Sequence, residues 1–415
     1  MSIKTMKLPF SPKQFLLIAL MLKSSLFYAS AGTLPSASLS GSIPAATAPV
    51  ANKPLITPSP PSLNAKSYIL IDVNSGKIIA EKNSEEKLPP ASLTKMMTLY
   101  VVSNALHNQQ IHLTDNVHIS REAWKIGGSR MFVKEGQQVS IEDLLKGIIV
   151  DSGNDACVAM AEHLGGSEEG FAEIMNHQAQ LLGMANSHFT DSTGLPDANL
   201  HTSAKDLAIL GRALINNFPQ YYHWYKQKWF TYNGIRQPNR NRLLWRDSQV
   251  DGVKTGHTND AGFCLVSSAK RDNMRLLAVV MGSPTESARA DDSERLLNYG
   301  FRFFETHQLY KGGQTIKEMP IYKGQSDKLA VGMREDQFIT IPAGQYQRLS
   351  ITTSVPKNLQ APLSKNDKIG DLIIHFDNTV MGNYPLYALE DAPAGGIFTR
   401  MKDAVRLSFA NWFSS

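Results

Sequence analysis

The spacing of apolar residues changes along the chain, and the first spacing is that of a β-hairpin. Residues 68–73 form an apolar run, Asn74-Ser75-Gly76 supplies a turn, and residues 77–80 form a return strand. After Pro89-Pro90 the spacing becomes helical over about 92–106. The same spacing predicts further helices at 141–149, 155–164, 170–182 and 204–215.

Strand patterns return later in the chain, at residues 262–268 and 275–281, joined by a polar turn at 271–273. A closing helix is predicted at about 293–305. Because strands stand at both ends of a stretch whose middle is helical, we expect one sheet built from both ends and covered by helices.

From about Gly312 short apolar runs alternate with Gly, Pro and Asn, which predicts a small all-β domain. The runs are 328–331, 337–341, 348–353, 371–376 and 383–389. This region holds no concentration of catalytic residue types, so we expect it to act as a spacer or docking module.

The tail after residues 393–396 has apolar residues on one helical face, namely Phe398, Met401, Val405, Phe409 and Trp412. The basic residues Arg400, Lys402 and Arg406 lie outside this stripe, and so does Leu407. A basic amphipathic helix of this kind favours a position in a membrane interface. The alternative is a terminal helix that packs on the protein's own surface.

The amino-terminal part is typical of an exported protein. Lys4, Lys7 and Lys13 precede an apolar run at 15–22, and Ala29-Ser30-Ala31 offers a cleavage site. The alternative is an uncleaved anchor. The predicted organisation is a signal peptide at 1–31, a Pro/Ser/Ala-rich linker at 32–62, a catalytic domain at 63–308, a β-rich domain at 309–392 and the amphipathic helix at 393–415.

Composition narrows the functional classes. The 415 residues carry a net charge of +5 without a long Lys/Arg stripe, which argues against nucleic-acid binding. Cys157 and Cys264 are too few for a disulfide framework, and whether they pair stays open. No Cys/His cluster has zinc spacing, so neither a metal nor a cofactor is predicted.

The first candidate motif is Ser92-Leu93-Thr94-Lys95. Residues three apart share a helix face, so the Lys95 amine can reach the Ser92 hydroxyl and take its proton. Desolvation would lower the pKa of such a lysine and make it a base. The spacing itself is weak evidence, because it recurs in this chain at Ser84/Lys87, Ser267/Lys270 and Ser354/Lys357. Ser92 stands apart because it follows the Pro-Pro stop and opens an apolar helix.

Two further motifs lie downstream. In Ser152-Gly153-Asn154, the serine can relay a proton to a leaving amine, and Asn154 can orient a substrate amide or Lys95. The alternative role of this motif is a helix cap. In Lys254-Thr255-Gly256-His257, lysine adds positive charge, Thr255 can bind a carboxylate and Gly256 lets substrate backbone approach. His257 is either catalytic or structural.

The ordered set of three motifs resembles the low-molecular-mass penicillin-binding proteins of the D-alanyl-D-alanine carboxypeptidase group, the penicillin-binding protein 5 type, peptidase family S11. The resemblance covers about residues 64–415 and is strongest at 128–133, 147–157, 239–241, 251–258 and 300–306. It implies an α+β fold: a serine β-lactamase/transpeptidase-like domain with an antiparallel sheet covered by helices, then a small all-β domain and a carboxy-terminal amphipathic helix.

The resemblance also implies residue roles. Ser92 would attack the carbonyl of the penultimate D-alanine, with Lys95 as base and the backbone N–H groups of Ser92 and His257 as the oxyanion hole. Ser152 would pass a proton to the departing D-alanine with support from Lys254. Arg289 would lie near the substrate's terminal carboxylate.

The expected partners are peptidoglycan stem peptides, β-lactams as inhibitors, and the inner-membrane surface on the periplasmic side. The oligomeric state stays open, a homo-oligomer included. Two alternatives remain at this point. One is a D,D-endopeptidase or weak β-lactamase that uses the same site, and the other is an inactive wall-associated scaffold.

Overall fold

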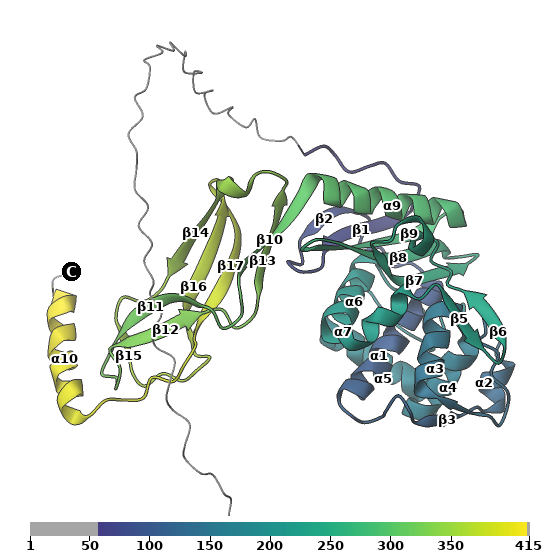
Figure 1. Cartoon of the computed structure of the whole chain (residues 1–415), viewed down its shortest axis with the longest axis horizontal. Helices are drawn as coiled ribbons and strands as arrows, with labels where there is room; N and C mark the ends of the chain where they lie inside the picture. The colour runs from purple at the N-terminus through teal and green to yellow at the C-terminus, as the bar shows by residue number, and fades with distance from the viewer. Residues whose placement is uncertain (1–56, 413–415) are drawn as a thin grey trace, which may run out of the picture. The chain divides into compact units, whose positions relative to one another are not determined.

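The structure is a computed structural model that describes residues 57–412. The predicted signal peptide and residues 32–56 of the predicted linker lie outside the described residues. The first domain is built on a five-stranded antiparallel sheet with the order β2-β1-β9-β8-β7 (Figure 1). Its strands are β1 Ser67–Asp72, β2 Ile78–Lys82, β7 Val250–Thr258, β8 Gly262–Arg271 and β9 Met274–Ser283. The predicted sheet built from both ends of the domain is therefore confirmed.

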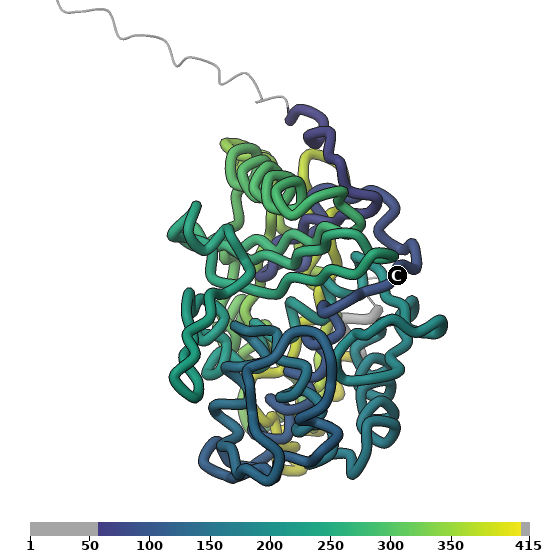
Figure 2. The backbone as a smooth tube through the Cα atoms, turned by 90° about the vertical axis from the view of Figure 1, so that its right-hand side faces the viewer, coloured from purple at the N-terminus to yellow at the C-terminus, as the bar shows by residue number. Residues whose placement is uncertain are grey.

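Both faces of this sheet are covered. Successive side chains of a strand point to opposite faces, so each strand contributes to two cores. In β1, Tyr68 and Leu70 join the core under helix α9 (Glu286–Phe303), whereas Ile69 and Ile71 join the larger core of the helical side. In the side view, α9 lies on one side of the sheet and the larger group of helices, at residues 95–217, lies on the other (Figure 2). Two covered faces explain why β1 is apolar throughout rather than alternating.

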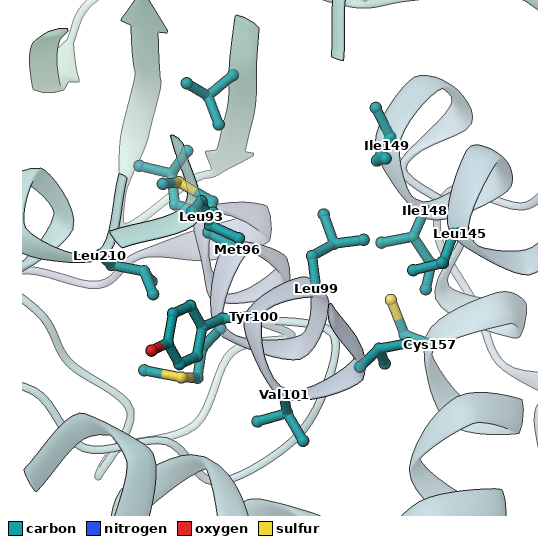
Figure 3. Close-up of a cluster of buried hydrophobic side chains, with 14 of the residues drawn as sticks. Leu93, Met96, Leu99, Tyr100, Val101, Leu145, Ile148, Ile149, Cys157 and Leu210 are labelled. Atoms are coloured by element: carbon teal, nitrogen blue, oxygen red, sulfur yellow. The ribbon is translucent and has the colours of Figure 1, made fainter. Parts of the chain in front are cut away.

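The helical side contains most of the helices that the apolar spacing predicted. They are α1 Lys95–His107, α3 Ile141–Lys146, α4 Asn154–Gly165, α5 Glu168–Leu182 and α6 Ala204–Asn217. Figure 3 shows their shared core, where Leu99 of α1 faces Ile148 and Cys157. Cys157 and Cys264 are both buried and free, so the two thiols are not joined.

Short elements fill the connections of this domain, and the apolar spacing predicted none of them. They are β3 Asn116–His118, α2 Arg121–Lys125, β4 Gln138–Ser140, α7 Pro219–Tyr222, β5 Trp229–Tyr232, β6 Ile235–Pro238 and α8 Leu243–Arg246. Elements of three to five residues are too short for a periodic pattern to be recognised.

The closing helix is longer than predicted at its start. Helix α9 spans Glu286–Phe303 rather than 293–305. The Thr285 side chain accepts a hydrogen bond from the Ala288 N–H and so caps the helix start. The first two turns are rich in polar residues, which hid them from a search for apolar spacing. Phe304 already belongs to strand β10, Phe304–Tyr310, and this ends the helix early.

The carboxy-terminal part is β-rich, as predicted. Six strands form a sheet with the order β14-β16-β17-β12-β11-β15, and β10 pairs with β13. Their bounds are β11 Thr315–Tyr322, β12 Lys328–Gly332, β13 Gln337–Pro342, β14 Leu349–Ser354, β15 Leu359–Gln360, β16 Lys368–Phe376 and β17 Thr379–Ala388. Alternate residues such as Leu372 and Ile374 form a separate core. Helix α10, Ile397–Trp412, ends the described chain.

A buried acid stands directly before the second motif. Helix α3 continues as a π-helical turn, Gly147–Asp151, and Ser152 then adopts a left-handed conformation with φ 61°. Asp151 is 2% exposed, and no described group hydrogen-bonds its Oδ1. The pKa of Asp151 is raised to about 7, mainly by burial and also by the neighbouring Asp155 carboxylate, while Arg240 and Gln237 oppose the shift.

The raised pKa makes stability depend on pH in a definite direction. Well below pH 4 the folded and unfolded forms of Asp151 are both protonated, so the carboxyl contributes little. As pH rises toward about 7, the unfolded chain loses the proton first, and the folded state is progressively destabilised. We expect Asp151→Asn, which is neutral throughout, to be more stable than the parent by roughly 2–4 kcal/mol at about pH 8. Urea unfolding between pH 4 and 8 tests this, and a difference that does not grow with pH would contradict it.

Candidate active site

Ser92 and Lys95 meet because the helix that carries them begins with a tighter turn. Residues Ala91–Thr94 form a 3₁₀ turn that continues directly into α1. Side chains three residues apart are eclipsed in such a turn. Lys95 Nζ therefore lies 2.9 Å from Ser92 Oγ. The left-handed Ala91, with φ 49°, turns the chain into this position.

Lys95 has the environment of a base. Its side chain is fully buried, and its Nζ also donates to the Thr193 carbonyl oxygen at 2.5 Å. Burial lowers the pKa of Lys95, and Arg240 lowers it further, while Asp191 and Asp155 act in the opposite direction. A neutral amine can take the proton of Ser92 as the hydroxyl attacks.

The loop that presents Thr193 is shaped by Asp191. This carboxylate accepts hydrogen bonds from the Thr193 N–H and hydroxyl, both at 2.6 Å, and from the Gly194 N–H at 2.7 Å. Gly194 has φ +83°, and a Cβ there would lie 1.9 Å from the Ala91 carbonyl oxygen. The loop therefore packs directly against the turn that carries Ser92, which is possible only with glycine at this position.

Glu168 supports the same loop from α5. Its two carboxylate oxygens accept from the N–H and the hydroxyl of Ser192, at 2.9 and 2.7 Å. Burial raises the pKa of Glu168. Because both oxygens are bonded to Ser192, this glutamate holds the loop in place.

The opposite wall brings together the second and third motifs. Ser152 Oγ lies 2.9 Å from Lys254 Nζ, which also donates to the Thr255 carbonyl oxygen at 3.1 Å. Lys254 belongs to β7, one of the two edge strands of the sheet, and is buried. Burial sets the pKa of Lys254 well below its usual value, and Lys95 and Arg240 add to this shift. Each of the two serines thus has its own buried lysine.

Asn154 and its neighbour Asp155 join this wall to the segment before it. Asn154 Nδ2 donates to the Gly127 carbonyl oxygen at 2.7 Å. The Asp155 carboxylate accepts from the backbone N–H groups of Met131, Phe132 and Val133 at 2.9–3.2 Å. Asp155 was not among the predicted site residues, although an acid in the first turn of a helix is a recognisable capping signal.

A pocket of about 250 Å³ opens between the two walls. Six predicted residues line it: Ser92, Ser152, Thr255, Gly256, His257 and Arg289. Lys95 and Lys254 lie behind the two serines to which they are bonded, and Asn154 is not among the lining residues. The His257 ring stacks on Phe263, with centroids 4.0 Å apart. A larger apolar pocket between β1–β2 and α6 contains none of the motif residues.

Four lining residues were not predicted as site residues: Ser129, Arg240, Phe263 and Glu286. Arg240 lies between two asparagines in a stretch that carries the family resemblance, so its motif was visible but its role was not. Glu286 and Arg289 come from the first turn of α9, which the sequence had assigned outside the helix. Within residues 57–412, no group of three or more His, Cys, Asp or Glu side chains is arranged to hold a metal ion.

Two family models match the chain. Residues 55–285 match D-alanyl-D-alanine carboxypeptidase, and residues 304–394 match the C-terminal domain of penicillin-binding protein 5. Together they cover the five-stranded sheet, the helices before α9, all three motifs and the β-rich part, whereas α9 lies between the two matched ranges.

Individual relatives agree with these models. The D-alanyl-D-alanine carboxypeptidase DacA of Escherichia coli (strain K12) is 43% identical over 379 residues, which cover 89% of this chain and 94% of DacA. The crystal structure of penicillin binding protein 5 from Haemophilus influenzae is similar with a TM-score of 0.77 and 44% identity, over 81% of this chain and 99% of that one.

A more distant solved relative is penicillin-binding protein D2 from Listeria monocytogenes in its ampicillin-bound form. It has a TM-score of 0.54 and 28% identity, over 58% of this chain and 98% of that one. The buried Ser-Lys pairs described above thus lie in a fold shared with penicillin-binding proteins. This chain belongs to the D-alanyl-D-alanine carboxypeptidases of peptidase family S11, in the penicillin-binding protein 5 group.

Proposed function

We propose that this carboxypeptidase removes the terminal D-alanine from peptidoglycan pentapeptide stems through an acyl-enzyme on Ser92. The observation that carries the proposal is the 2.9 Å contact between Ser92 Oγ and the fully buried amine of Lys95. An amine of lowered pKa next to a hydroxyl is what a serine nucleophile requires when no histidine is paired with it.

Acylation follows from this contact. Lys95 takes the proton of Ser92 as Oγ bonds to the carbonyl carbon of the penultimate D-alanine. The oxyanion that forms is stabilised by the backbone N–H groups of Ser92 and His257. The carbon–nitrogen bond then breaks. The proton that Lys95 took from Ser92 passes through the Ser152 hydroxyl, which is bonded to Lys254, to the departing amine of D-alanine, and Lys95 is neutral again.

Deacylation uses water as the second nucleophile. Lys95 is the nearest base to the ester, because its amine remains beside Ser92 Oγ. Water gives a proton to Lys95 as it attacks the ester carbon, and Lys95 passes that proton to Ser92 Oγ when the peptide leaves. Arg289, Thr255 and Gly256 line the pocket in which the terminal carboxylate would be held.

β-Lactams should acylate the same serine. The Listeria relative has been solved in an ampicillin-bound form. In this chain Glu168 is bonded to Ser192, and Glu286, the acidic residue among the described pocket lining, is paired with Arg242 and Arg289. Both carboxylates are therefore engaged, which leaves neither of them free to speed hydrolysis of the ester. Slow turnover, and therefore inhibition, is the expected outcome.

The nucleophile can be tested by mass spectrometry after exposure to ampicillin. We expect a stable adduct on the peptide that contains Ser92, and Ser92→Ala should lose both the adduct and at least about a thousandfold in kcat/KM on a peptide ending in D-Ala-D-Ala. Ser354→Ala is the matched control, since Ser354 and Lys357 have the same spacing but lie in the β-rich part. An unlabelled Ser92, or full activity of Ser92→Ala, would refute the assignment.

We also propose that the enzyme is exported through residues 1–31 and held at the periplasmic face of the inner membrane by α10. Phe398, Met401 and Val405 are 89%, 65% and 57% exposed, which supports an outward-facing apolar stripe. The other side of α10 packs inward, because Leu407 is buried and Asp403 accepts from the Lys323 N–H at 2.7 Å. Among the described helices, none is long and apolar enough to cross a membrane, so the proposed attachment is interfacial.

Membrane attachment predicts binding to vesicles that contain phosphatidylglycerol. The double change Phe398→Glu with Met401→Glu should weaken vesicle binding by at least about tenfold, because it puts charge where apolar side chains would enter the membrane. Co-sedimentation measures the binding, and peptide hydrolysis in solution should stay unchanged. The control Gln325→Glu with Ser350→Glu adds the same charge on exposed positions outside α10. Equal binding of both double variants and the parent would contradict the proposal.

A further inference from the structure

We propose that Glu286 is a built-in counter-ion for Arg289, which competes with the substrate's terminal carboxylate and thereby sets the affinity of the pocket. The proposal rests on the role assigned to Arg289 under the proposed function. Of the described residues that line the pocket, Glu286 is the only acidic one, and it stands among Arg240 and Arg289.

The contact is built by the start of α9. Glu286 and Arg289 are three residues apart in the first turn, so they lie on the same face. Arg289 Nη2 is 3.3 Å from Glu286 Oε1. The Arg289 side chain is 7% exposed, whereas that of Glu286 is 39% exposed and can move toward solvent.

Arg289 does not depend on Glu286 for its position. Its Nη1 donates to the Gly256 carbonyl oxygen of β7 at 3.1 Å, and its guanidinium lies over the Phe263 ring at 5.6 Å. Burial lowers the pKa of Arg289, and the negative charge of Glu286 opposes that shift. Glu286 therefore supplies charge compensation that a substrate carboxylate could supply instead.

The geometry favours exchange between the two carboxylates. Glu286 reaches Arg289 with one oxygen only, and an incoming carboxylate that pairs through two oxygens gains a second charge-assisted hydrogen bond. The other oxygen of Glu286, Oε2, accepts from Arg242 Nη2 at 3.0 Å. Arg242 is exposed and stands outside the pocket lining. It can thus hold Glu286 when the substrate takes Arg289.

This arrangement predicts two single changes of opposite sign. Glu286→Gln keeps the shape and removes the charge, so KM for an acylated tripeptide ending in D-Ala-D-Ala should fall about threefold to tenfold, with kcat changed less than about twofold. Arg242→Gln should raise KM, because Glu286 then acts on Arg289 alone. The rise should be smaller in the Glu286→Gln background, which a double-mutant cycle measures.

The test includes a substrate that isolates the proposed competition. The same tripeptide with a carboxamide in place of the terminal carboxylate should show no gain from Glu286→Gln. Glu294→Gln is the matched control, since Glu294 lies on the same helix, contacts Arg246 at 3.5 Å and is not part of the pocket lining. Its KM should equal that of the parent.

The outcomes separate this inference from the proposed function. If Arg289→Gln leaves KM unchanged while the protein stays folded by thermal unfolding, the carboxylate subsite is wrong. If Arg289→Gln raises KM by about tenfold or more but Glu286→Gln does not lower it, the subsite stands and the counter-ion role is refuted. If Glu286→Gln raises KM only for peptides with a free side-chain amine, Glu286 binds that amine, which also refutes the competition.

Discussion

The buried amine of Lys95 is the constraint on which the rest of the catalytic region depends. A charged amine without water is unfavourable, so the surroundings favour the neutral form that accepts a proton. Several local features serve this one group: the 3₁₀ turn places Ser92 Oγ beside it, and the loop shaped by Asp191 offers the Thr193 carbonyl. Close packing of Gly194 against Ala91 keeps the two parts together.

The buried lysines and the buried carboxylates of the site have different roles. Lys95 and Lys254 are each bonded to a serine, whereas Asp155, Asp191 and Glu168 bind backbone N–H groups and hold loops in place. The carboxylates thereby shape the site without taking part in the chemistry. The charged residues that line the pocket are Arg240, Arg289 and Glu286. The two arginines favour a peptide that ends in a carboxylate, and Glu286 offsets part of their positive charge.

Some elements were predictable because their signal is local. Apolar spacing predicted the β1–β2 hairpin, the helices α4 to α6 and the β-rich part. Each of these elements buries apolar side chains on one face or on both faces, and this leaves a regular pattern in the sequence. The start of α9 was missed for the same reason: its first turns bury polar groups such as Arg289 and Asp292, which carry no apolar period. That miss concealed the position of Glu286 next to Arg289.

The sequence by itself determined the three motifs, their order and the pairing of Ser92 with Lys95, because three residues of spacing on one helix bring two side chains together. The Ser-x-x-Lys spacing alone could not distinguish Ser92 from the other such pairs in the chain, and only the preceding Pro-Pro and the following apolar helix did so. Only the tertiary structure decided that Lys254, 102 residues away, bonds to Ser152. It also placed Arg240 and Glu286 in the pocket and left the α10 stripe exposed. Contacts between distant segments depend on how sheet and helices pack, and no local pattern encodes that packing.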